Sequence, residues 1–166
     1  IIGASKEQIQ EICNNGNILV VANYNAPDQI VLSGDIDSID GAISYCKKNG
    51  VRRVIPLKTS GAFHSPLMKS ARSALIEIID SIEFKNTSIP VYQNTNPIPE
   101  TNGKIIKNNL INQLEGSVYW VDTIKNMAKD HNQTFIEVGP GKVLYKLNNK
   151  ILKKSDTLTF NMINLV

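Results

Sequence analysis

The sequence predicts an α/β fold in two parts, because strand and helix patterns alternate along the chain and change character after residue 58. Before this point, two β-rich runs lie between two segments that carry apolar residues at helical spacing. After it, strand patterns are separated by longer helical patterns. We therefore expect residues 1–58 to form a small subdomain and residues 59–166 to form part of a larger one.

Two helices are expected in the first part. Ser5 is positioned to cap a helix over residues 6–14, whose isoleucines share one face. Asp35 or Asp37 can cap a second helix over residues 37–48, again with one apolar face. Both helices therefore have a side that can pack against a sheet.

The strands of the first part complete the order β-α-β-β-α-β. Residues 1–3 have the pattern of a strand end, and residues 18–24 and 29–33 are β-rich runs. The turn-forming sequence NAPD between these two runs predicts a hairpin. A last strand is expected over residues 53–57. This order is the ferredoxin-like plan, a small sheet with two helices on one face.

The second part begins with a strong helix signal. Ser65 stands at the N-cap position and Pro66 at the first helical position of a helix that should reach about residue 82. The apolar stripe that should face a core consists of Leu67, Ala71, Leu75, Ile78, Ile79 and Ile82.

Further along, strand and helix patterns alternate. Strands are expected over residues 89–94 and 134–138, and helices over residues 103–114, 118–129 and 142–152. Strands separated by helices favour parallel pairing. Because two strands do not make a stable sheet alone, we expect other strands to complete it.

Composition and charge exclude several functional classes. The net charge of +3 at pH 7 is far below the basic excess of a dedicated nucleic-acid binder. No apolar run approaches the roughly 18 residues of a membrane span, which favours a soluble protein with no membrane partner. Cys13 and Cys46 lack metal-ligand spacing, so we expect buried thiols in a reducing compartment, with a disulfide as the alternative, and no metal site.

One of the two histidines, His64, stands in the sequence TSGAFHSPLM directly before a predicted helix. A loop position beside small residues is typical of an active-site residue carried on a rigid scaffold. A loop histidine is nevertheless more often structural or solvated, so a catalytic role needs support from elsewhere.

Four segments supply that support: NYNAPDQIVLSG, SGAFHSPLM, QLEGSVYW and FIEVGPGKVL. In their order and separations, the chain resembles malonyl-CoA:acyl carrier protein transacylases from Ile1 to about Leu152. The resemblance implies the carboxyl-terminal half, or slightly more, of such an enzyme. It also implies a ferredoxin-like small subdomain inserted into an α/β-hydrolase-like large subdomain, of which residues 59–166 are the carboxyl-terminal part.

The resemblance further implies a reaction of type II fatty-acid biosynthesis. In this family, a serine on a GHSxG elbow attacks malonyl-CoA, and the resulting ester passes the malonyl group to the phosphopantetheine thiol of acyl carrier protein. The general base is a histidine that aligns with His64. Its other ring nitrogen is oriented by a backbone carbonyl at the position of Gln113, whose side chain matters less.

Three more site residues follow from the same resemblance. Asn25 matches an asparagine in a loop near the active site, although turn formation would also explain it. Asn94 matches another family asparagine. Phe63 stands where related acyltransferases that select malonyl groups have phenylalanine, whose ring fills the space of an α-methyl group; core packing is the alternative.

The departures from the family pattern are informative. Asp28 replaces a common glycine in the hairpin turn, which suggests an altered turn. No GxSxG occurs in the 166 residues, and no arginine stands where it could clamp the malonate carboxylate. We therefore expect the serine, the arginine and an oxyanion-hole glutamine upstream of this chain, and no catalysis by the chain alone.

A dense basic cluster is formed by Lys47, Lys48, Arg52 and Arg53. It is either a solvated helix end or a docking surface for an acidic carrier protein. The expected partners are acyl carrier protein and malonyl-CoA, with no nucleic acid and no bound cofactor, since the partner carries the phosphopantetheine. We expect a full-length monomer in the bacterial cytoplasm or in the lumen of a plastid or mitochondrion.

Two alternatives stay open. The same motifs would fit an acyltransferase domain of a fatty-acid or polyketide megasynthase. A ferredoxin-like binding module for protein or nucleic acid is a different class. It needs exposed aromatic side chains on the sheet or a long basic stripe, and Tyr24 is the one aromatic residue available on those strands.

Overall fold

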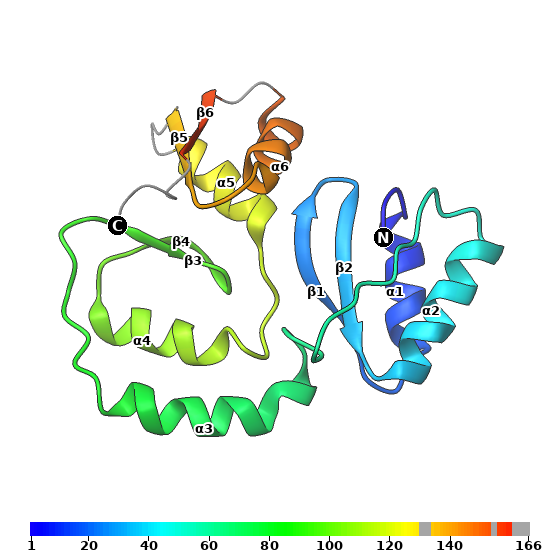
Figure 1. The fold of residues 1–166 in the computed structure, drawn as a ribbon, viewed down its shortest axis with the longest axis horizontal. Helices are drawn as coiled ribbons and strands as arrows, with labels where there is room; N and C mark the ends of the chain where they lie inside the picture. The colour runs from blue at the N-terminus through cyan, green and yellow to red at the C-terminus, as the bar shows by residue number, and fades with distance from the viewer. Residues whose placement is uncertain (130–133, 154–155, 161–166) are drawn as a thin grey trace.

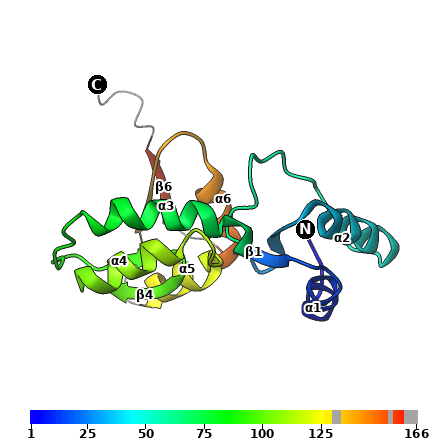
Figure 2. The same cartoon turned by 90° about the horizontal axis from the view of Figure 1, so that it is seen from below.

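The computed structural model describes residues 1–129, 134–153 and 156–160 of an α/β chain. Figure 1 shows two parts side by side. The smaller part holds α1 (Lys6–Asn14), β1 (Leu19–Ala26), β2 (Gln29–Gly34) and α2 (Ile36–Lys48). Both helices lie on the same side of the hairpin in Figures 1 and 2.

The two helices of the smaller part begin as their caps predict. Ser5 and Gln8 form a capping box at α1, in which the Ser5 side chain accepts from the Gln8 amide and the Gln8 side chain accepts from the Ser5 amide. The Asp35 carboxylate accepts from the Ser38 amide at the start of α2. The buried core between the helices and the hairpin consists of Ile12, Leu19, Ala42 and Cys46.

The hairpin is antiparallel, as predicted, but the two outer strands are not formed. Ile2 makes single antiparallel bridges to Gln29 and to Arg53, and no strand covers residues 1–3 or 53–57. The prediction was wrong because Gly3 turns the chain with a positive φ of 79° and Pro56 has no amide hydrogen to donate to a ladder.

Strand β1 contains two irregular positions. Its register against β2 advances by two residues between Val21 and Asn23 and between Tyr24 and Ala26, while β2 advances by one. Ala22 and Asn25 are therefore extra residues on β1. Such bulges bend a strand and change where its side chains point.

The larger part begins with a tighter helix than expected. The turn η1 (Pro66–Met68) is a 3₁₀ helix, and α3 (Lys69–Asp80) continues it. The Ser65 side chain caps η1 as predicted, accepting from the Leu67 amide. Only Ile79 of the predicted stripe is buried, whereas Ile78 and Ile82 are 61% and 50% exposed. The stripe is open because, among the described elements beyond η1, α3 packs against α4.

The three other predicted helices are present. They are α4 (Gly103–Asn112), α5 (Trp120–Lys129) and α6 (Val143–Leu152). Trp120 donates its indole hydrogen to the buried Asn148 side chain, which joins α5 to α6. Figure 1 shows α3 and α4 on one side of the larger part and α5 and α6 on the other.

The strands of the larger part pair differently from the prediction. Strand β3 (Val91–Gln93) pairs antiparallel with β4 (Asn96–Glu100), and β5 (Thr134–Val138) pairs in parallel with β6 (Asp156–Phe160). Strand β4 escaped prediction because its sequence NPIPE contains two prolines, which are depleted in strands. The expectation of parallel pairing is therefore wrong for β3 and correct for β5.

The two parts are joined by a short parallel contact. Val118 pairs with Asn23 of β1, and the Ser117 hydroxyl donates to the Val21 carbonyl at 2.6 Å. Helices α5 and α6 also pack against β1.

In the described part of the chain, no helix has the length and apolar character of a membrane span. Cys13 and Cys46 are free, and Cys46 is buried in the core.

Candidate active site

The backbone of His64 is fixed in position independently of the contacts that its ring makes. Its φ of 59° lies in the left-handed region, which a residue other than glycine rarely adopts. The His64 amide donates to the Leu114 carbonyl at 3.0 Å. Next to it, the fully buried Ser65 donates its hydroxyl to the Ala62 carbonyl at 2.6 Å. These bonds hold a strained turn, which is a frequent feature of functional sites.

The His64 ring meets two carbonyl oxygens through one nitrogen. Nδ1 lies 2.9 Å from the Gln113 oxygen and 3.0 Å from the Gly116 oxygen. Carbonyl oxygens only accept hydrogen bonds, so Nδ1 must carry the proton in the neutral ring. The lone pair is then at Nε2, where the half-buried imidazole can take a proton from a neighbouring group. The contact with Gln113 is the one that the resemblance led us to expect.

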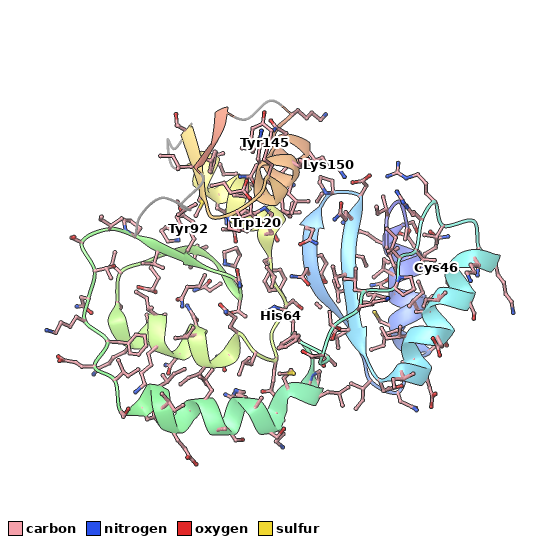
Figure 3. All side chains as sticks on the ribbon, viewed as in Figure 1. Cys46, His64, Tyr92, Trp120, Tyr145 and Lys150 are labelled. Carbon is pink, nitrogen blue, oxygen red and sulfur yellow. The ribbon has the colours of Figure 1, made fainter. Side chains whose placement is uncertain are left out.

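A single segment, residues 113–119, connects the predicted site residues. It follows α4, gives three carbonyls to His64, and pairs with β1 through Val118. Its Tyr119 amide donates to the Asn94 carbonyl at 2.9 Å, in the turn between β3 and β4. Figure 3 shows His64 between this segment and β1.

Asn25 and Asn94 thus belong to the two regions that segment 113–119 contacts, namely β1 and the turn between β3 and β4. Asn25 is the bulged residue next to Tyr24, whose amide donates to the Val118 carbonyl at 2.9 Å. Both asparagines are partly buried. Their side chains and the His64 ring come from three different places in the chain around one segment. Within the described residues, no hydrogen bond joins the three side chains.

Phe63 immediately precedes His64 in the chain. The residue is 45% exposed, so it does not fill the core of the described residues. A side chain added at Gly61 would lie 3.8 Å from both the Phe63 ring and the Met68 sulfur, which places the two near each other. Phe63 is therefore free to contact a bound molecule.

The basic cluster lies at a distance from the histidine. Lys47 and Lys48 are exposed in the last turn of α2, which Figure 1 shows on the side of the small part that faces away from α3. Arg52 forms an ion pair of 2.7 Å with Asp28 in the hairpin turn. Asp28 does not have a positive φ, so the replacement of glycine adds an ion pair without a strained turn. Nearby, Lys150 of α6 donates to the Gln29 side chain at 3.3 Å.

Sequence reasoning missed several parts of this arrangement. The contact with the Gly116 carbonyl was missed because a backbone carbonyl leaves no recognisable residue type in the sequence. Glu137 lies in the FIEVGPGKVL segment, is buried, and accepts from the Leu144 and Tyr145 amides at the start of α6. The negative carboxylate interacts favourably with the positive N-terminal end of the α6 dipole, so Glu137 anchors this helix.

Other chemistry finds less support in the described residues. Tyr24 stacks on Tyr119 with ring centroids 5.4 Å apart. Burial, followed by the neighbouring Tyr119, raises the pKa of Tyr24 above its usual value. The ring is thus already partnered, which disfavours an open stacking platform for nucleic acid. No cluster of three metal-ligating side chains occurs in residues 1–129, 134–153 and 156–160.

A cavity of about 310 Å³ lies between α1 and α2. Its lining includes Asn15, Asp37 and Tyr45, and none of the predicted site residues. Because the cavity is remote from His64, it adds nothing to the chemistry of the histidine.

Known proteins resemble this chain over most of its length. The sequence model of the acyl transferase domain family matches residues 3–164. A curated malonyl CoA-acyl carrier protein transacylase of Bacillus subtilis is 38% identical over 155 residues, which are 93% of this chain and 49% of that protein. The chain spans about half the length of the curated relatives that it matches.

Solved structures give the same result. The malonyl-CoA:ACP transacylase of Synechocystis matches with a TM-score of 0.91 and 31% identity, over 99% of this chain and 55% of that chain. A malonyl-transacylase in complex with the acyl-carrier protein of a type II polyketide synthase matches with a TM-score of 0.90 and 31% identity, over 97% of this chain and 53% of that one.

Proposed function

The chain belongs to the acyl transferase domain family, and we propose that it is part of an enzyme that moves a malonyl group from CoA to acyl carrier protein. The reaction would pass through a serine ester and end on the phosphopantetheine thiol of the carrier. The observation that carries the proposal is the double contact of His64 Nδ1 with the Gln113 and Gly116 carbonyls, which leaves a free lone pair at Nε2.

In this mechanism, His64 works as a general base and then as a general acid. Nε2 takes the proton of the serine hydroxyl as the serine oxygen attacks the thioester carbonyl, and it gives that proton to the departing CoA thiolate. In the second half, Nε2 takes the proton of the carrier thiol while its sulfur attacks the ester. The proton then returns to the serine oxygen.

The nucleophile is proposed to lie outside these residues. The 166-residue sequence has no GxSxG, and the chain spans about half of its relatives. We infer that the serine, the arginine that clamps the malonate carboxylate and an oxyanion-hole glutamine come from a segment before Ile1. Within the chain, Asn25 and Asn94 would line the substrate site, and Phe63 would limit the size of the acyl group.

The finer architecture is part of the same proposal. Residues 1–58 would be a ferredoxin-like small subdomain, supported by two helices on one side of a hairpin and by the bridges of Ile2 to Gln29 and Arg53. Residues 59–166 would be the carboxyl-terminal part of an α/β-hydrolase-like large subdomain, supported by the parallel pair β5 and β6. His64 would then stand between the two.

The proposed docking surface for acyl carrier protein is the basic cluster Lys47, Lys48, Arg52 and Arg53. Charge complementarity with an acidic carrier supports it, since all four side chains are exposed. Lys150 extends this positive surface onto the larger part. We further propose that the full-length enzyme is monomeric, carries no cofactor of its own, and works in the bacterial cytoplasm or in an organelle lumen.

The experiment that tests the function follows the covalent intermediate. Full-length enzyme mixed with malonyl-CoA should gain one malonyl group by mass spectrometry and should lose it when carrier protein is added. His64→Ala should slow both steps by about 10² to 10⁴-fold, the usual contribution of a general base. Unchanged rates in His64→Ala would remove this residue from the mechanism.

A matched control keeps the test specific. Asn15 lines the remote cavity between α1 and α2, so Asn15→Ala should transfer malonyl at the wild-type rate. Absence of a malonyl adduct on the wild-type enzyme would refute the proposed function.

A further inference from the structure

Arg72 on α3 contacts both sides of the loop that orients the catalytic imidazole. Its Nη2 donates to the Asn112 side chain at 3.1 Å, and its Nε lies 3.3 Å from a Glu115 carboxylate oxygen. Asn112 ends α4, immediately before Gln113, and Glu115 comes immediately before Gly116. The guanidinium thus holds residues next to each carbonyl that accepts from His64.

A short, regular stretch of chain connects Arg72 to His64. His64 is followed by the capped turn η1 and then by α3, in which Arg72 lies in the first turns. The Arg72 side chain therefore links the rigid segment that carries the imidazole to the loop that carries its acceptors. Movement of that loop away from α3 would separate the His64 Nδ1 hydrogen from the Gln113 and Gly116 oxygens.

Stability alone is a weak explanation for this ion pair. The Arg72 Nε is buried, yet its approach to Glu115 does not have hydrogen-bond geometry, so a buried donor is left without a proper partner. Such a group costs free energy, and partly buried ion pairs contribute little net stability. What the pair does provide is a defined position for residues 112–116.

We propose that Arg72 is a positioning residue that keeps the Gln113 and Gly116 carbonyls on His64 Nδ1 and so keeps the lone pair at Nε2. Its kinetic consequence rests on the proposed function, whereas its effect on the imidazole does not. If Arg72 is removed, the loop is released and the Glu115 carboxylate loses its partner. The ring then samples the tautomer with the proton on Nε2, which cannot accept a proton from a nucleophile.

The test measures the tautomer directly. Nitrogen-15 NMR of the full-length protein distinguishes Nδ1-protonated from Nε2-protonated imidazole, and the His64 signals are identified by their loss in His64→Gln. The Nδ1-protonated form should predominate in the wild type. In Arg72→Ala its ratio to the other tautomer should fall by roughly 5- to 10-fold, as expected for the loss of about one hydrogen bond.

Kinetics and conservative variants separate positioning from folding. Arg72→Ala should lower kcat for malonyl transfer by about 10-fold with KM for malonyl-CoA unchanged, because substrate binding is not altered. Arg72→Lys keeps the charge without the two-pronged contact, so it should restore only part of the tautomer ratio and of kcat. Glu115→Gln should act in the same direction as Arg72→Ala and should not add to it in the double variant.

The matched control is an ion pair that joins α3 to α4 without involving residues 112–116. Lys107 of α4 lies 2.9 Å from Asp80 of α3, at the end far from the histidine loop. Lys107→Ala should leave the tautomer and kcat unchanged. An unchanged tautomer in Arg72→Ala, or an equal change in Lys107→Ala, would overturn the inference. If no malonyl transfer is found in any variant, the proposed function fails, and the NMR result still decides the role of Arg72.

Discussion

At the scale of single residues, the candidate site depends on backbone carbonyls. Gln113 and Gly116 orient His64 Nδ1 where many hydrolases use a carboxylate. Neutral carbonyl dipoles fix the ring without adding a negative charge; in the proposed function, a carboxylate partner would repel the carboxylate of the malonyl substrate. The side chain of Gln113 can therefore vary, while its peptide group cannot move.

Phe63 carries the prediction about substrate choice. Replacing it by serine removes an exposed ring beside His64, so the enzyme should accept a branched acyl group more readily. We expect the ratio of methylmalonyl to malonyl transfer to rise by up to roughly 10-fold, the value of about one methyl group in an apolar site. Competition between the two CoA esters, followed by mass spectrometry of the carrier, measures this ratio.

Leu67 provides the control for Phe63. It is similarly exposed on η1 but is not adjacent to His64 in the chain. Leu67→Ala should leave the ratio at the wild-type value. The same ratio in wild type and Phe63→Ser would assign the ring to packing within the full-length protein.

At the scale of elements, the position of α4 determines where Gln113, its C-cap residue, lies relative to His64. Its first residue, Gly103, is buried against the backbone of Phe84 and Lys85. A Cβ at this position would lie 2.2 Å from the Phe84 carbonyl oxygen. Glycine is therefore required here for close approach, although φ is not positive.

Two glycine substitutions should have opposite effects on stability. Gly103→Ala must displace the backbone of residues 84–85, and we expect a loss of about 1–3 kcal/mol in the free energy of unfolding. Gly41→Ala lies in the exposed interior of α2 with nothing within 4 Å of the new Cβ, so it should add about 0.5–1 kcal/mol. Urea unfolding of the full-length protein measures both. Stabilisation by Gly103→Ala would show that the contact with Phe84 can relax.

At the scale of the whole molecule, the described residues leave apolar surfaces open. Ile136 and Val138 of β5 are 56% and 61% exposed. Ile78 in the last turn of α3 and Ile82 just after this helix are similarly exposed. A parallel pair of strands is normally covered and extended by others. These surfaces are consistent with the proposal that further strands and helices of a longer enzyme pack here.

The 166-residue chain produced alone should therefore aggregate and bind a hydrophobic dye, and it should form no malonyl adduct. The double variant Ile136→Lys and Val138→Lys should bind less dye, because it places charges on the exposed face of β5. Ile36→Lys is the control, since Ile36 is 80% exposed on α2 in the smaller part. Gel filtration and dye fluorescence measure both properties. A monomer that binds no dye would contradict the proposal of missing strands.

Much of the local structure could be predicted because it depends on neighbours along the chain. Helix α1 begins at its Ser5 cap, α2 at its Asp35 cap, and the turn at Pro27 and Asp28 joins a hairpin, all from short-range signals. The motif around His64 and the segment QLEGSVYW also identified the contact between His64 and Gln113, through resemblance. No local rule predicts β4, because its prolines hide a strand that exists only through pairing with β3.

Only the tertiary structure decided how the site is held. The contact of His64 with the Gly116 carbonyl and the two contacts of Arg72 join residues about 40 to 50 positions apart. No periodicity along the chain encodes such pairs, and none encodes the left-handed backbone of His64. The sequence by itself determined which residue types and caps are present. The packing of α3 against α4, and of segment 113–119 against β1, determined which carbonyls face the imidazole, because a peptide group carries no side-chain signature.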